Sequence, residues 1–226
     1  MRDDICTIPI SEVFEVKDGC PLCRMHKTVE DRIIGYIMGD AMMEPDVRIM
    51  TNETGFCREH YKKMTEREGR LQLALMLESH VNHIREAALS ADNSLKCNAE
   101  AAEKADTSCF ICDKIKWGED RMIATIYRLY ENEPEFRELF NSQPQFCFAH
   151  YTRLVSGIGK KTCKKHGKEL AENLVRITGE YADRISKNIT GYCSFYDYRH
   201  AGKNNFGDSR FAVEDALEFL TGEKFK

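Results

Sequence analysis

The chain is poor in the residues that interrupt regular structure. Among its 226 residues there are only five prolines. Proline breaks helices and central strands, so its scarcity permits long elements. The frequent Glu, Lys, Leu, Ala and Met favour helix over sheet. The composition therefore predicts a mainly α protein.

The chain also lacks a long apolar run and an export signal. Nothing approaches the roughly 20 apolar residues of a membrane-spanning helix. The first residues, Met1 to Cys6, contain no apolar stretch of the length that a secretory signal needs. We therefore expect a cytoplasmic protein that has no membrane segment and keeps its thiols reduced.

The chain also carries only a small net charge. The formal charge of −4 and the hydrophobic content of 42% are typical of a soluble globular protein. A general nucleic-acid binder normally carries net positive charge, so this partner is not favoured. No nucleophile–base pair, phosphate-binding glycine loop or paired-carboxylate pattern is visible. The sequence therefore predicts no particular reaction.

The strongest signal is a pattern of cysteine and histidine that occurs twice. Each half of the chain contains a Cys-x2-Cys clip, a long insert and then a Cys-x2-His clip. The eight residues are Cys20, Cys23, Cys57, His60, Cys109, Cys112, Cys147 and His150. Three thiolates and one imidazole complete a closed tetrahedral zinc site. We therefore predict two zinc ions, one held by the two clips of each half.

Other uses of these cysteines remain open at this stage. Buried free thiols, disulfides and dithiol redox chemistry are the alternatives to metal. A cytoplasmic location disfavours disulfides. An iron–sulfur cluster usually takes four thiolates, whereas each half supplies three, so zinc is preferred over iron.

The repeat extends beyond the clips. The stretch 44–48 matches 133–137 with a shared Glu-Pro start, and Asn52 falls on Asn141. This likeness indicates an internal duplication. We expect four segments: a first zinc-stapled helical repeat (1–91), a linker (92–108), a second zinc-stapled repeat (109–189), and an irregular segment with a C-terminal helix (190–226).

Helical spacing of apolar residues predicts the main elements. We expect helices over 21–39, 57–68, 71–89 and 162–188, and a last helix that begins near Asp208 and stops at Gly222. The helix over 71–89 should bury one stripe. Its members are Leu71, Leu75, Leu77, Val81, Ile84 and Ala88.

Two further groups could hold a metal. His80 and His83 lie three apart on one helix, where partly exposed histidines are the plainer interpretation. Cys163 and His166 form a third Cys-x2-His, but it has no Cys-x2-Cys mate. Their conceivable partners are Cys193 and His200.

A lysine cluster lies at an expected helix start. It comprises Lys160, Lys161, Lys164, Lys165 and Lys168. Helix N-termini bind anions, so phosphate, a nucleotide or a nucleic-acid backbone could bind there. A solvated lysine face is the simpler interpretation.

The clip residues, with Cys-Pro-Leu-Cys and Gly-Phe-Cys-Arg-Glu-His-Tyr in the first half, resemble those of an uncharacterised family of bacterial cytoplasmic proteins. The resemblance covers most of the chain. It implies a bacterial origin and a metal-stapled helical fold. Members are sometimes labelled as transporter substrate-binding proteins. The chain shows neither an export signal nor the strand–helix alternation of such proteins.

Two functional hypotheses follow. The favoured one is a zinc-stabilised adaptor that presents a helical surface to a protein or an anionic small molecule. The alternative is a metal-dependent or anion-binding enzyme with a pocket between the repeats, built from His80, His83 and the segment 190–207. A redox switch through the Cys-x2-Cys clips is a third, weaker hypothesis.

Overall fold

The computed structural model describes residues 10–159, 163–196 and 207–224, and within these ranges the protein contains helices and no strand. The prediction of a mainly α fold is confirmed. No helix among these residues has the length and the apolar character needed to cross a bilayer.

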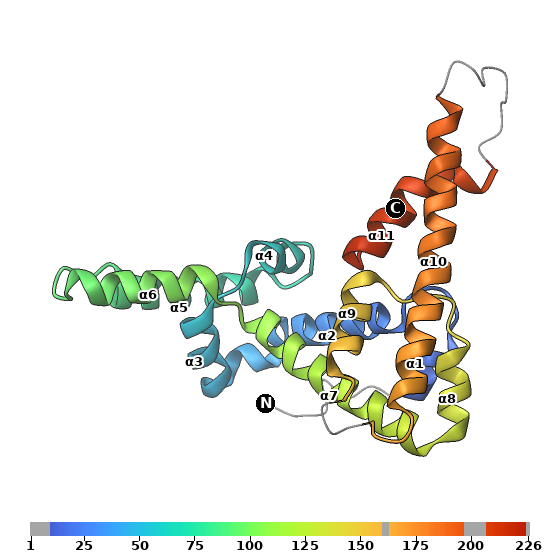
Figure 1. The fold of residues 1–226 in the computed structure, drawn as a ribbon. Helices are drawn as coiled ribbons and strands as arrows, with labels where there is room; N and C mark the ends of the chain where they lie inside the picture. Colours follow the sequence, from blue (N-terminus) through green and yellow to red (C-terminus); the bar gives the residue numbers. More distant parts are fainter. Residues whose placement is uncertain (1–9, 160–162, 197–206, 225–226) are drawn as a thin grey trace. The chain divides into compact units, whose positions relative to one another are not determined.

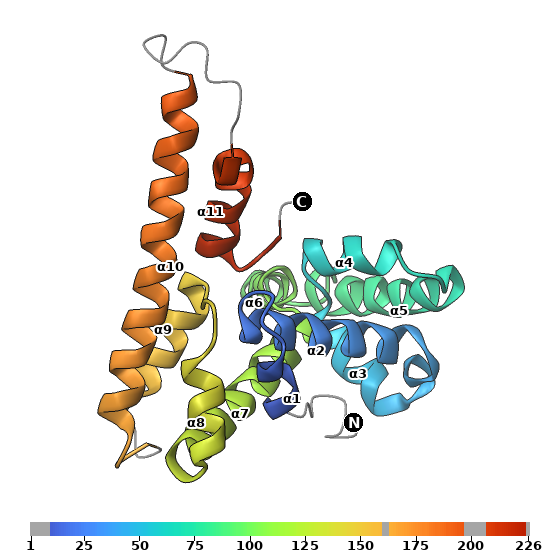
Figure 2. The same cartoon turned by 90° about the vertical axis from the view of Figure 1, so that its right-hand side faces the viewer.

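The helices fall into two compact units (Figures 1 and 2). Unit 1 contains residues Lys27–Asp120, and unit 2 contains Ile8–His26 with Arg121–Lys226. Each unit therefore takes residues from both halves of the sequence.

Two long helices contribute residues to both units. Helix α2 spans Pro21–Met38 and α7 spans Phe110–Asn132. The first six residues of α2, Pro21–His26, belong to unit 2, while α7 passes from unit 1 to unit 2 near its middle. Each helix therefore begins in one unit and ends in the other.

Unit 1 contains four further helices besides the larger part of α2 and the first half of α7. They are α3 (Pro45–Thr54), α4 (Arg58–Thr65), α5 (Arg70–Ala88) and α6 (Leu95–Thr107), with a 3-10 turn η2 (Asp40–Met43) before α3. Helices α5 and α6 lie side by side as a hairpin (Figure 1). The expected linker thus contains a helix. The side chain of Ser94 caps it by accepting a hydrogen bond from the backbone N–H of Cys97.

The buried face of α5 differs from the predicted stripe. Leu73, Met76 and His80 are buried, whereas Leu71 and Val81 are 69% and 59% exposed. Apolar residues occur on both sides of this helix, so spacing alone could not show which side faces the core.

Unit 2 contains α1 (Ile10–Glu15), α8 (Pro134–Asn141), α9 (Phe148–Gly157), α10 (Gly167–Phe195) and α11 (Ala212–Thr221), with a 3-10 turn η4 (Gly207–Phe211) before α11. Helix α10 extends further than predicted and takes up the start of the expected irregular segment. Helices α9 and α11 pack along it (Figure 2).

An aromatic cluster joins the N-terminal helix to the second half of the chain. The ring of Phe14 lies 5.2 Å from that of Phe136 and 5.6 Å from that of Phe140. The side chain of Gln143 donates a hydrogen bond to the backbone oxygen of Phe14. These contacts place the first clip in unit 2, because Cys20 follows α1 closely in the chain.

Candidate metal centres

All four clips lie at helix N-termini. Cys57 and Cys147 are the N-cap residues of α4 and α9, and each histidine follows in the first turn. Cys20 and Cys109 directly precede α2 and α7. The positive end of a helix dipole favours a thiolate, the form of cysteine that binds metal.

The four clips meet in two groups, each inside one unit. In unit 1, Cys57 and His60 meet Cys109 and Cys112, a group that we name site 1. In unit 2, Cys20 and Cys23 meet Cys147 and His150, which we name site 2. The eight predicted residues therefore gather in two Cys3His groups.

The predicted pairing of the clips was wrong, because each site takes one clip from each half. The physical reason lies in helix lengths. After Cys23, α2 carries the chain away by about 27 Å, and α3, which follows, spans only about 15 Å. In the second half, α7 spans about 35 Å and α8 only about 12 Å. Each Cys-x2-His clip is thus left near the clip of the other half.

The distances in site 1 fit a tetrahedral zinc ion. The Nδ1 atom of His60 lies 3.1 Å from the sulfur of Cys57, 3.3 Å from that of Cys109 and 3.5 Å from that of Cys112. The sulfurs of Cys57 and Cys112 are 3.9 Å apart. Bonds of about 2.3 Å to sulfur and about 2.0 Å to nitrogen give tetrahedral edges of about 3.5–3.8 Å, and the separations in site 1, from 3.1 to 3.9 Å, come close to them.

Site 2 repeats this geometry. The Nδ1 atom of His150 lies 3.0 Å from the sulfur of Cys147, 3.3 Å from that of Cys23 and 3.7 Å from that of Cys20. The sulfurs of Cys23 and Cys147 are 3.5 Å apart, too far for a disulfide. The nine cysteines of the described residues are all free. In both sites the histidine presents Nδ1 to the three sulfurs.

In each site one cysteine favours the ionised form, whereas the pKa is raised for Cys112 by burial and for Cys23 by its hydrogen bond with Cys147. Burial opposes ionisation in site 1, but hydrogen bonds between His60 and Cys109 prevail, so the pKa of Cys109 falls to about 6 and that of His60 rises to about 10. In site 2, hydrogen bonds from Cys20 and Cys23 lower the pKa of Cys147. Thiolates are thus available to a cation, whose binding would release the histidine proton.

A buried carboxylate supports the histidine of site 1. Glu30 on α2 accepts a hydrogen bond from Nε2 of His60 at 3.0 Å, and the ammonium of Lys63 lies 2.7 Å from both of its oxygens. Burial alone would raise the pKa of Glu30, but these two partners lower it to about 2. The bond fixes Nδ1 of His60 as the ligand atom.

Glu30 was not among the predicted site residues, although its position in the sequence is a signal. Glu30 follows Cys23 by seven residues, and Glu119 follows Cys112 by the same number. Both carboxylates are buried within long amphipathic helices, where an acid is unusual.

His80 and His83 form no metal group with other described residues. His80 is buried and donates from Nδ1 to the backbone oxygen of Asn52 at 2.8 Å. Its ring lies so close to Gly55 that a Cβ there would approach Nε2 to 2.6 Å. His83 is half-buried and lines a cavity of about 280 Å³, beside Glu53.

The third Cys-x2-His likewise stands apart from both sites. The thiol of Cys163 donates to Glu131, and burial raises its pKa to about 12. Nδ1 of His166 lies 2.9 Å from Glu169. Cys193 is exposed near the end of α10, and His200 lies outside the described residues.

A carboxylate of the same chain already binds at the start of α10. The carboxylate of Glu131 accepts hydrogen bonds from the backbone N–H groups of Lys165 at 2.9 Å and His166 at 3.2 Å. These bonds lower the pKa of Glu131 to about 2. Lys168 pairs with Glu172 one turn later, while Lys160 and Lys161 lie outside the described residues. Glu131 thus occupies backbone donors that an external anion would need.

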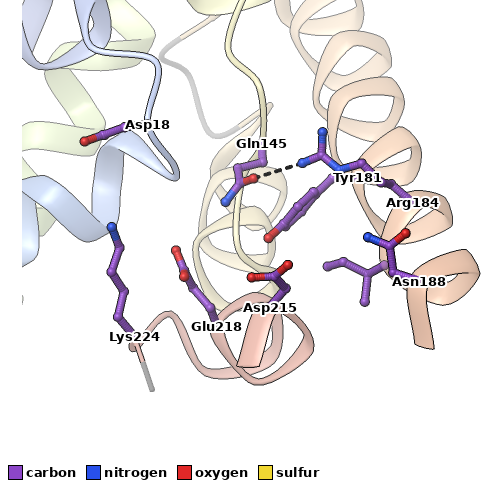
Figure 3. A pocket seen from close by; sticks show the side chains of 9 residues that line it. Asp18, Gln145, Tyr181, Arg184, Asn188, Asp215, Glu218 and Lys224 are labelled. Atoms are coloured by element: carbon purple, nitrogen blue, oxygen red, sulfur yellow. Dashed lines mark hydrogen bonds between the residues drawn. The ribbon is translucent and has the colours of Figure 1, made fainter. Parts of the chain in front are cut away.

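A polar cavity of about 230 Å³ lies beside site 2 (Figure 3). Its wall includes Asp18 and Gln145, each two residues before a site 2 cysteine, and Asp215 and Glu218 from α11. It contains neither His80 nor His83 and therefore differs from the predicted enzyme pocket.

Comparison with known proteins identifies a family but no individual relative. The model of DUF6062, described as a family of unknown function, matches residues 1–226. No curated protein and no solved structure matches the chain.

Proposed function

The chain belongs to the DUF6062 family, and because that family has no known function, we propose from the chain's own residues that it is a two-zinc helical interaction module. In this proposal the ions hold helices together and catalyse nothing.

The single observation that carries the proposal is the pair of Cys3His groups. Four protein ligands fill a tetrahedral zinc shell, whereas catalytic zinc sites keep one position open for water or substrate. Three thiolates and one imidazole suit zinc better than an iron–sulfur cluster, which usually takes four thiolates. The closed donor sets therefore support zinc in a structural role.

The exposed side of α5 supports an interaction role. At 100° per residue, the exposed apolar side chains of this helix lie within an arc of about 120°. They are Leu71, Leu77 and Val81. Adjoining apolar side chains on a surface mark contact sites for other proteins. This stripe favours a protein partner over an anionic small molecule, because Glu131 already occupies the start of α10. The acidic net charge does not favour nucleic acid.

We also propose a cytoplasmic location. Zinc binding through three cysteines per site requires free thiolates, which a reducing compartment maintains. The resemblance noted above agrees with a bacterial cytoplasm.

Elemental analysis of the purified chain tests the metal proposal. We expect two zinc ions per chain and loss of helical circular dichroism when a strong chelator removes them. Structural zinc contributes roughly 10–16 kcal/mol in small zinc domains, as much as a typical domain's whole stability. Fewer than one zinc per chain, or a chelated protein that keeps its fold and thermal midpoint, would contradict the structural role.

Photo-crosslinking tests the interaction role separately. A photoreactive residue at Val81 should give one dominant protein adduct in the cells that produce the chain. The matched position is Glu86, on another side of the same helix and 76% exposed as a side chain. Equal labelling from both positions would reject the stripe as a contact surface.

A further inference from the structure

The two sites hold the same donors but differ in solvent access. In site 2, Cys20, Cys147 and His150 are buried and Cys23 is half-buried. In site 1, His60 and Cys109 are buried and Cys57 is half-buried, but Cys112 is exposed. Site 1 thus contains one exposed cysteine, and site 2 contains none.

The C-terminal helix covers site 2. Helix α11 ends at Gly222, which adopts a left-handed conformation with φ +81°. A Cβ on Gly222 would lie 3.3 Å from the sulfurs of both Cys23 and Cys147. The backbone at residue 222 therefore lies directly against two ligand atoms, at a distance that only glycine allows without displacement.

Side-chain packing holds this cover in place. The ring of Phe219 on α11 lies 6.2 Å from that of Phe148, which begins the helix that carries His150. The same ring lies 5.5 Å from that of Tyr181 on α10. Reagents can reach the sulfurs of Cys23 and Cys147 from this side only if α11 moves.

We propose that site 1 is an exchangeable and thiol-reactive metal site, with Cys112 as its first reacting ligand, and that α11 keeps site 2 closed. The inference rests on the proposed zinc binding. Cysteine reactivity requires an accessible thiolate, and Cys112 is the ligand that has this access. Site 1 would react with small thiol-directed electrophiles and lose its ion, while site 2 would keep its ion and hold its helices together.

The reaction of Cys112 with a maleimide illustrates the step. The sulfur adds to the carbon–carbon double bond, and its bond to the ion gives way to a carbon–sulfur bond. Water supplies the proton that the neighbouring carbon takes. The thioether would be a weak zinc ligand, so site 1 would hold the ion through Cys57, His60 and Cys109 alone and would lose it to an external chelator.

The test uses the full zinc-loaded chain and limiting N-ethylmaleimide. Peptide mass spectrometry follows each cysteine, and a colorimetric chelator follows released zinc. We expect Cys112 to be modified at least tenfold faster than Cys20, Cys23 and Cys147, with release of one zinc per chain. Cys97 and Cys193, exposed and outside both sites, serve as internal standards for a free thiol.

A matched pair of glycine variants tests the cover. Gly222→Ala should accelerate labelling of Cys23 and Cys147 several-fold and leave Cys112 unchanged. Gly159→Ala is the control, because Gly159 also has a positive φ, of 87°, but a Cβ there would meet nothing within 4 Å. It should leave the labelling of both sites unchanged.

The outcomes separate this inference from the metal proposal. Two zinc ions per chain with equal labelling of both sites, or with faster labelling of site 2, would overturn the inference and leave zinc binding intact. A Gly222→Ala variant that labels like Gly159→Ala would overturn the role of α11. A chain without zinc would remove the metal proposal itself.

Discussion

At the scale of single residues, Glu30 shows how a side chain outside the ligand set tunes a site. It orients His60 through Nε2 and is itself held by Lys63. Such a carboxylate fixes the ring of a metal-bound histidine and raises its basicity. Glu30 therefore belongs to site 1 although it touches no ion.

Replacing Glu30 with Gln should weaken zinc binding at site 1 by about 10- to 100-fold, the usual effect of losing such a partner. Competition with a chelator of known affinity measures this change. Asp31→Asn is the control, because Asp31 is the adjacent acid and pairs with Arg67 at the surface. Equal affinities in the two variants would show that Glu30 does not support the ligand.

His80 is a residue whose role the sequence left open, and its contacts make it structural. His80→Ala should lower the free energy of unfolding by about 1–3 kcal/mol, because the part-buried backbone oxygen of Asn52 loses its hydrogen bond to the buried His80. Both this variant and the control His83→Ala should keep two zinc ions. Urea unfolding and elemental analysis measure the two effects. Loss of a zinc ion in either variant would show that the replaced histidine is a metal ligand.

At the scale of elements, the carboxylate of Glu131 at the end of α7 caps the start of α10. The hydrogen bonds from Lys165 and His166 hold its pKa near 2, below the ordinary value of 4.5. A carboxylate with a lowered pKa stabilises the fold above its ordinary pKa. That contribution is lost as the pH falls from about 4.5 toward 2.

The wild type should therefore have a larger free energy of unfolding than Glu131→Gln. We expect this gap to be constant near neutral pH and to shrink below about pH 4.5. Urea midpoints between pH 7 and pH 3 measure the gap. Glu135→Gln, on the exposed face of α8, is the control and should show no such dependence. A gap that widened in acid would contradict the capping role.

The elements also show what could be predicted from the sequence. The helix over 21–39 was predictable because Pro21 and the apolar spacing agree, and α2 spans Pro21–Met38. Helix α6 lies in the segment that we expected as a linker, because its thirteen residues bury none of their side chains and therefore show no apolar stripe. The buried side of α5 was mistaken because Leu71 and Val81 are apolar and yet exposed.

At the scale of the whole molecule, the ligands were predictable and their pairing was not. Spacing identifies a clip because both ligands lie within one helical turn. It cannot show which two clips share an ion, since that depends on the lengths of α2 and α7. The two Cys3His groups thus join the two halves of the sequence twice, and each group lies in a unit that takes residues from both halves.

The most direct test of this crossed arrangement is the zinc content of two double variants in the presence of a moderate chelator. In Cys57→Ser with Cys112→Ser, both changes fall in site 1, and we expect one zinc per chain to remain. In Cys20→Ser with Cys57→Ser, one ligand is lost from each site, and we expect both ions to be lost. The reverse result, with one zinc retained by the second variant and none by the first, would show that each half of the chain binds its own ion and would contradict the account.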